Sequence, residues 1–174
     1  MTPWLPIAGA GAIVGAAGAV LLGRKREAAR LAALVRRLRE GGPAQGRVDF
    51  GVFDALPEPV RRYFRYALTD GQPMIRAGVF RQSGQLRTSV EAARWSAFTA
   101  EHIVVPPATG FVWCARIETP LATHVRVLDS YVAGIGAGHV SLLSAFPIAS
   151  ETGLPELNAG ELHRYLAEAV WYPT

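Results

Sequence analysis

The sequence has one cysteine, Cys114, among 174 residues. A single cysteine excludes an intrachain disulfide and a metal site built from several cysteines. Because Cys114 lies in a strand-like run, we interpret it as a small buried apolar side chain. The four histidines lack H-E-x-x-H or H-x-H spacing, and no G-x-S-x-G elbow, P-loop or kinase signature occurs. We therefore assign no metal, no cofactor and no catalytic residue.

Positive charge is scarce outside the N-terminal segment. Residues 1–42 hold seven Lys or Arg and two Glu, a net charge of +5, whereas residues 43–174 hold eleven Arg and twelve Asp or Glu, a net charge of −1. The formal charge of +4 therefore belongs to the N-terminal segment. A nucleic-acid-binding domain needs a basic surface, so we exclude nucleic acid as a partner.

Charge is absent altogether from residues 3–23. As a helix this run would be about 31 Å long, close to the ~30 Å hydrocarbon core of a bilayer, with Trp4 at one interface. Its glycines miss the G-x-G-x-x-G spacing of a dinucleotide-binding turn and follow no strand. We predict a transmembrane helix over residues 1–23, with the lipid bilayer as a partner.

Small residues recur every fourth position in this predicted span, at Gly11, Gly15 and Ala19. Such a face lets two helices approach closely, which favours a homodimer, although Ala and Gly can also simply fill an anchor. The alternative to an anchor is a signal peptide cleaved near Ala17-Gly18-Ala19. All seven basic residues of the segment follow the span, so the positive-inside rule places the C-terminal domain in the cytoplasm.

Residues 24–42 predict a basic juxtamembrane helix with a leucine stripe that includes Leu31, Leu34 and Leu38. Two interpretations are open. The helix lies along anionic headgroups, or it packs on the domain through its leucines. Glycines and a proline then mark a linker over residues 43–55.

Residues 56–174 predict an α+β domain, in which a curved antiparallel sheet of about six strands packs with helices. A short helix is expected within 56–73, with Pro59 in its first turn. A final helix is expected over 158–171, capped by Asn158 with Glu161 three residues later. Between them, alternating apolar residues and turn signals predict six strands: 74–83, 86–92, 98–105, 110–118, 124–133 and 139–146.

The best polar constellation lies on the final helix, where Glu161, Arg164 and Glu168 share one side with Trp171. Trp113 and Asp129, from two predicted strands, complete the candidate ligand-binding residues. In a cavity, such carboxylates would have shifted pKa values. The alternative is a salt-bridged helix face, since Arg164 and Glu168 are spaced i, i+4.

Four blocks carry a family resemblance: LPEPVRRYFRYAL, GFVWCARI, VRVLDSYV and GELHRYLAEAVWYPT. They resemble an uncharacterised bacterial family, a domain of unknown function, over nearly all of residues 56–174. The strand-rich pattern is similar to the half-barrel of lipoprotein-carrier proteins, which shelters a lipid. Because the family continues past the last block with further strands, the resemblance implies a half-barrel that is truncated, incomplete at the C-terminus.

These observations lead to one functional expectation. The chain is a membrane-anchored protein that binds an apolar or lipid-like ligand without catalysis, with the sheet as the cavity and the final helix as its polar lip. The alternatives are an envelope-associated enzyme that uses Glu161 and Glu168, and a dimeric membrane scaffold.

Overall fold

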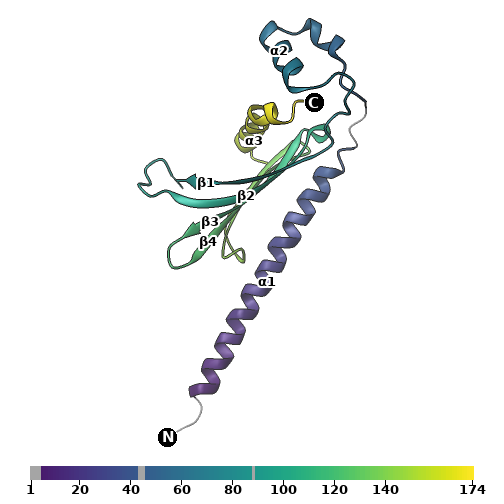
Figure 1. The fold of residues 1–174 in the computed structure, drawn as a ribbon. Helices are drawn as coiled ribbons and strands as arrows, with labels where there is room; N and C mark the ends of the chain where they lie inside the picture. The colour runs from purple at the N-terminus through teal and green to yellow at the C-terminus, as the bar shows by residue number, and fades with distance from the viewer. Residues whose placement is uncertain (1–4, 43–45, 88) are drawn as a thin grey trace.

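The computed structural model describes residues 5–42, 46–87 and 89–174, with side chains in the first helix described from Gly15 onward (Figure 1). It shows an α+β fold in which one long helix and one short helix lie on opposite faces of a curved, open antiparallel sheet. The predicted interfacial Trp4 and residues 43–45 of the predicted linker lie outside the described residues. Within the part of the chain that the structure describes, no helix is long and apolar enough to cross a membrane.

Helix α1 runs without interruption from Leu5 to Arg39, so the uncharged run and the basic helix predicted after it form one element. Its C-terminal half packs on the sheet through Leu31, Leu34, Val35 and Leu38, and the side chain of Leu38 is fully buried. This is the second of the two interpretations of the leucine stripe. The arginines 36, 37 and 39 near the helix C-terminus also interact favourably with the helix dipole.

A small unit of two helical segments follows. The 3-10 helix η1 (Phe50–Ala55) begins where the Asp49 carboxylate accepts the backbone N–H of Gly51, and α2 (Glu58–Ala67) has Pro59 in its first turn, as predicted. A bridge between Arg47 and Pro73 closes the unit at its base. The predicted linker over 43–55 therefore contains regular structure from Phe50 onward.

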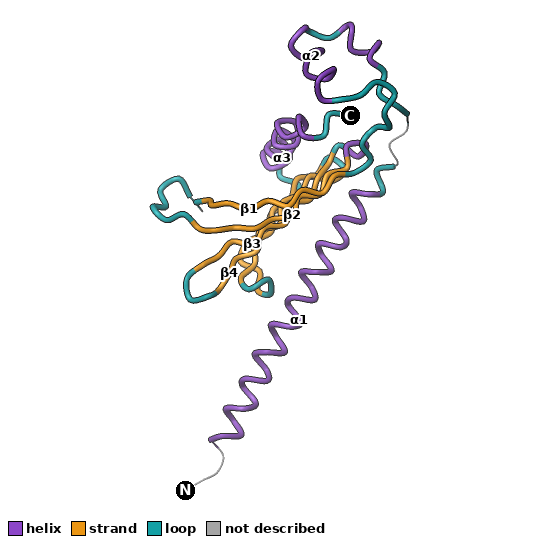
Figure 2. The backbone as a smooth tube through the Cα atoms, viewed as in Figure 1, coloured by secondary structure: helices purple, strands orange, loops and turns teal. Residues whose placement is uncertain are grey.

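Six strands form a meander in which each strand pairs only with its neighbours in the chain (Figure 2). The strands are β1 (Gly78–Leu86), β2 (Ser96–Val105), β3 (Gly110–Thr119), β4 (Thr123–Val132), β5 (Ile135–Leu142) and β6 (Phe146–Thr152). A two-residue turn joins β4 to β5 and short connections join the other pairs, which is why every pairing is antiparallel. The 3-10 turn η2 (Pro106–Ala108) separates the second and third strands.

The predicted number of strands is confirmed, but two assignments are wrong. The strand predicted over 86–92 is not a strand, because Leu86 ends β1 and residues 89–92 form a turn. The strand missed is β6, whose residues are all exposed. An edge strand without a buried face carries no apolar alternation, so periodicity does not detect it.

Helix α3 (Pro155–Glu168) lies on the face of the sheet opposite α1 and continues into the 3-10 turn η3 (Ala169–Trp171). The predicted N-cap is wrong, since the helix begins three residues before Asn158. The Asn158 side chain instead accepts the backbone N–H of Gly136 at 2.8 Å, tying the helix to β5.

Two apolar cores result, one on each face of the sheet. Val112 and Leu128 pack with Leu38 under α1, whereas Phe111 packs with Tyr165 and Tyr172 under α3. Residues on both faces of β3 are buried, because a helix covers each face of the sheet.

Candidate functional site

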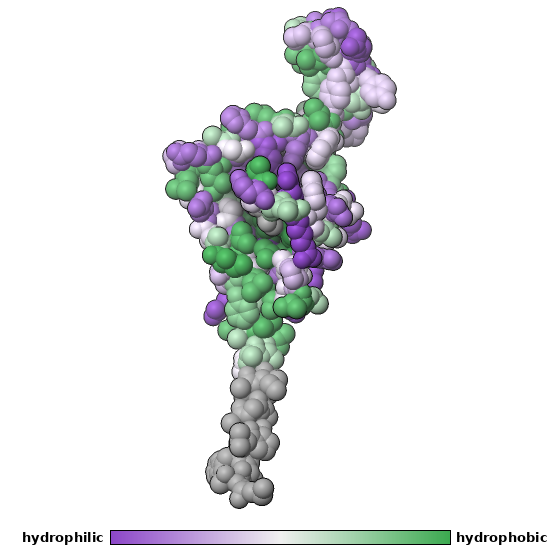
Figure 3. All heavy atoms as spheres, turned by 90° about the vertical axis from the view of Figure 1, so that its left-hand side faces the viewer, coloured by the Kyte–Doolittle hydropathy of each residue, from purple (hydrophilic) through white to green (hydrophobic). Residues whose placement is uncertain are grey.

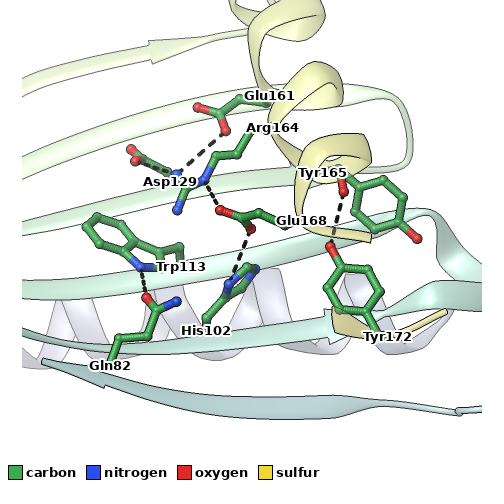
Figure 4. Close-up of polar contacts among 9 residues, drawn as sticks. All are labelled: Gln82, His102, Trp113, Asp129, Glu161, Arg164, Tyr165, Glu168 and Tyr172. Atoms are coloured by element: carbon green, nitrogen blue, oxygen red, sulfur yellow. Dashed lines mark hydrogen bonds and ion pairs between the residues drawn. The ribbon is translucent and has the colours of Figure 1, made fainter. Parts of the chain in front are cut away.

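The predicted polar residues meet around Arg164, which points from α3 onto the sheet (Figure 4). Its Nη1 lies 3.1 Å from Asp129 Oδ2 on β4 and 3.9 Å from Glu161 Oε2, and its Nε lies 3.3 Å from Glu168 Oε1. The guanidinium also lies 4.9 Å from the ring centroids of Phe111 and Trp113. A planar guanidinium can pair with carboxylates at its edge and stack on rings with its face.

His102, on β2, extends this polar cluster into the core. Its side chain is fully buried, and its Nδ1 lies 3.4 Å from Glu168 Oε2, without the alignment of a hydrogen bond. The rings of Phe80 and Phe111 flank it. No motif in the sequence identifies His102 as a site residue, because a lone histidine in a predicted strand has no spacing that distinguishes it from other core residues.

Burial controls the protonation of the cluster. Burial, and then the charge of Arg164, lower the pKa of His102 to about 4, so the imidazole is neutral near pH 7. Burial, reinforced by the Asp129 charge, raises the pKa of Glu161 to about 7 despite the opposing effect of Arg164. Burial likewise raises the pKa of Asp129, against the attraction of Arg164.

The geometry fits a clamp that fixes α3 on the sheet. Asp129 and His102 come from strands, Glu161, Arg164 and Glu168 come from the helix, and each polar contact joins or braces the two layers. Because the guanidinium lies between the carboxylates, it compensates the charges that burial would otherwise make costly.

Two tryptophans from the predicted set differ in their placement. Trp113 lies under Arg164 and donates its Nε1–H to Gln82 Oε1 at 2.7 Å. Trp171 lies outside the cluster, is half exposed and has its ring 6.1 Å from that of Phe80. The structure therefore brings together five of the six predicted residues, all but Trp171.

A separate apolar pocket of about 710 Å³ opens between the η1–α2 unit and the C-terminal end of α3. It does not lie on the face of the sheet that was expected to form the cavity, where α3 packs. None of the six predicted residues lines it. Its walls are mainly aliphatic and aromatic, including Val52, Phe53, Val60, Phe64, Leu68, Tyr165, Leu166, Ala169, Val170 and Tyr172.

Hydrogen bonds hold the two walls of this pocket together. The Tyr63 hydroxyl on α2 donates to the carbonyl oxygen of Val170, and the backbone N–H of Ile75 donates to Thr174 Oγ1 at 2.7 Å. Tyr172 OH donates to the Tyr165 carbonyl oxygen at 3.2 Å and packs against its ring. The clamp around Arg164 thus positions the helix whose other side forms a pocket wall.

A second buried polar contact lies on the opposite face of the sheet, and no sequence motif predicted it. Glu27 of α1, only 3% exposed, has Oε1 2.9 Å from His139 Nε2 on β5. Ser141 Oγ donates to Glu27 Oε2 at 3.3 Å. These contacts fix the position of α1 on the sheet. Among the described residues, no group of three or more His, Cys, Asp and Glu could hold a metal ion.

Comparison with known proteins gives the chain its family. The family of unknown function DUF6544 matches residues 47–174, which contain the η1–α2 unit, the whole sheet and α3. The chain belongs to the DUF6544 family. No curated protein and no solved structure matches the chain. The DUF6544 match excludes α1, although this helix covers one face of the DUF6544 sheet.

Proposed function

We propose that this DUF6544 protein binds an apolar, lipid-like ligand without catalysis, held near a bilayer by the N-terminal half of α1. The observation that supports this is the pocket of about 710 Å³ with its largely apolar lining. Ligand pockets of proteins have volumes of about 300–1,000 Å³ and apolar walls with a few polar groups. Here the polar side chains of the lining are those of Arg47, Asp49, Thr174 and three tyrosines.

The competing enzyme hypothesis has less support. Arg164 pairs with both Glu161 and Glu168, so the two carboxylates that would act on a substrate already share a cation. The membrane proposal draws on the uncharged run before Arg24, on the exposed side chains of Leu21 and Leu22, and on the basic residues that follow them.

Photoreactive fatty acid labelling tests the pocket in the full chain, delipidated and reconstituted in nanodiscs. We expect labelled peptides from the η1–α2 unit and from residues 165–174. Val170→Trp should reduce this labelling about tenfold, because an indole would fill space at a lining position.

The matched control is Ala167→Trp, which adds the same ring to an exposed position of α3 that does not line the pocket. It should label like the wild type. Equal labelling of both variants, with unchanged circular dichroism, would remove the pocket as the binding site.

A further inference from the structure

The meander places three connections at one end of the sheet, here named the tip end, whose described residues are 87, 89–95, 120–122 and 143–145. Helix α1 reaches the tip end at Gly23, which packs directly on the backbone of Ala145, while Arg24 Nε donates to the Leu143 carbonyl oxygen at 3.2 Å. At the other end of the sheet Gly41 packs on Ala108. The uncharged half of α1 therefore leaves the domain at the tip end (Figure 1).

Large apolar side chains are exposed at the tip end. Leu121 is 95% exposed, Val90 is 80% exposed and Trp95 is 57% exposed. Figure 3 shows apolar residues gathered on the domain next to the place where α1 leaves it. Exposed apolar side chains that gather at one end of a domain are typical of an interaction surface, and these three lie on two of the three connections of the tip end.

The turn that carries Leu121 is strained. Leu121 and Ala122 have φ angles of 61° and 55°, in the left-handed region where tight hairpin turns ordinarily place Gly or Asn. Ala133 in the turn at the opposite end, and Leu143 and Ser144 in another turn of the tip end, have similar φ angles of 53°, 56° and 55°. What distinguishes Leu121 is its exposure of 95%, because no packing within the fold accounts for a large apolar side chain at this position.

Positive charge is also present at the tip end. Arg24, Lys25 and Arg26 are exposed on α1 beside the tips, and the β1–β2 connection carries two more exposed arginines, Arg87 and Arg94. The guanidinium of Arg87 lies 5.3 Å from the ring centroid of Trp95. The carboxylates near these residues in the sequence are Glu91, Glu118 and Glu27, the last of them buried against His139, so positive charge is in excess at this end.

We infer that the tip end is a docking surface for an anionic lipid bilayer, with Leu121 and Trp95 entering the interface beside α1. The inference rests on the proposed anchoring by α1 and extends it from one helix to one face of the domain. A bilayer is favoured because the surface continues directly from an uncharged helical run, and because its charge complements anionic headgroups.

Docking at the tip end sets the orientation of the molecule. Because α1 continues into the core without a hinge at Gly23, and Glu27 pairs with His139 one turn later, the strands would stand away from the bilayer. The apolar pocket, at the opposite end, would then face the aqueous side.

Fluorescence of an environment-sensitive label tests the inference in the full chain. Cys114→Ala removes the native thiol, and Leu121→Cys then carries the nitrobenzoxadiazole label in vesicles of phosphatidylcholine and phosphatidylglycerol. Because Leu121 is exposed, its replacement leaves the fold intact. We expect a blue shift and about twofold quenching by spin-labelled lipid, both weaker in vesicles of phosphatidylcholine alone. The label on Ala133→Cys, at the opposite end, should stay in water.

A third label, on Gly15→Cys, separates docking from anchoring, since Gly15 has no atom within 4 Å of the position of a Cβ. If spin-labelled lipid quenches the label at position 15 but not the label at position 121, the proposed docking surface is wrong and the proposed anchor is retained. If neither is quenched, both proposals are wrong. A blue shift at position 121 that depends on protein concentration in lipid-free detergent would instead show that the tip end contacts a second copy of the chain. This result would contradict docking on a bilayer.

Discussion

At the scale of single residues, the polar cluster combines two opposite pKa shifts within one contact network. Glu168 lies between Arg164 and His102, and Glu161 lies at the edge of the same guanidinium. The pKa of Glu161 is raised and that of His102 is lowered, in both cases mainly by burial. Both groups therefore favour their neutral forms, as buried groups with incomplete compensation do.

Replacing Glu161 with Gln should change how stability depends on pH. The folded pKa of Glu161, about 7, lies above its ordinary value of 4.5, so the folded state holds this proton more tightly than the unfolded chain. Stability from this group is therefore lost as pH rises from 4.5 to about 7. Relative to the wild type, Glu161→Gln should gain on the order of 2 kcal/mol across this window, measured by urea unfolding in mild detergent.

His102 changes the pH dependence of stability in the opposite direction to Glu161, so the contributions of the two groups can be distinguished. Its pKa falls from 6.5 to about 4 on folding, so its contribution to stability is lost as pH falls through that range. In the Glu161→Gln variant the free energy of unfolding should therefore rise with pH up to the ordinary histidine pKa of 6.5 and then level. Parallel curves for variant and wild type would show that Glu161 titrates normally, and would contradict the burial argument.

Five of the six predicted site residues form the cluster at Arg164, and part of this grouping is local. Glu161, Arg164 and Glu168 share a helix face by spacing alone, and Trp113 and Asp129 are directly paired on neighbouring strands. The partner of Glu168 was not predictable, because His102 reaches it only through the pairing of β2 with β3 and the packing of α3 on both.

At the scale of elements, the contact of α1 with the sheet is the feature that joins the two halves of the chain. A Cβ at Gly23 would overlap the backbone of Ala145, whereas Leu38 fills the core at the other end. The backbone of Ala145 cannot move aside as a flexible side chain could. Glycine at position 23, which has no Cβ, therefore allows α1 to approach the sheet this closely.

Gly23→Ala should therefore destabilise the protein by about 1–3 kcal/mol, because the added methyl group pushes α1 away from the sheet. Gly18→Ala is the matched control on the same helix, since no atom lies within 4 Å of a Cβ there. It should be neutral or stabilise by about 0.5–1 kcal/mol through helix propensity. Thermal unfolding in detergent measures both, and equal effects would show that Gly23 makes no close contact.

At the scale of the whole molecule, the two ends of the sheet differ. The tip end carries exposed apolar side chains and positive charge beside the uncharged half of α1, and the other end carries the apolar pocket. If both proposals hold, the docking surface and the ligand pocket are separated by the length of the strands, and the protein would present its ligand away from the bilayer.

The expected homodimer belongs to this scale. Gly15 and Ala19 are exposed on α1, whereas Gly23, the next small residue of that series, already packs on the sheet. If the stripe associates, Gly15→Leu should abolish crosslinked dimers of the full chain in membranes, because leucine prevents close helix approach. Gly18→Leu, off the stripe, should keep them. Crosslinking that persists in Gly15→Leu would exclude a dimer through this face.

Local patterns in the sequence determined the α+β class, the antiparallel sheet, helices α2 and α3, and the grouping of polar residues on α3. These follow from periodicity and from spacing within one element, which neighbouring residues decide. Only the tertiary structure decided that α1 packs on the DUF6544 sheet, that Glu27 meets His139, and that the pocket lies between α2 and α3. Each of these joins residues far apart in the chain, where the packing of whole elements and the cost of burying charge select the partner, and no local pattern carries that information.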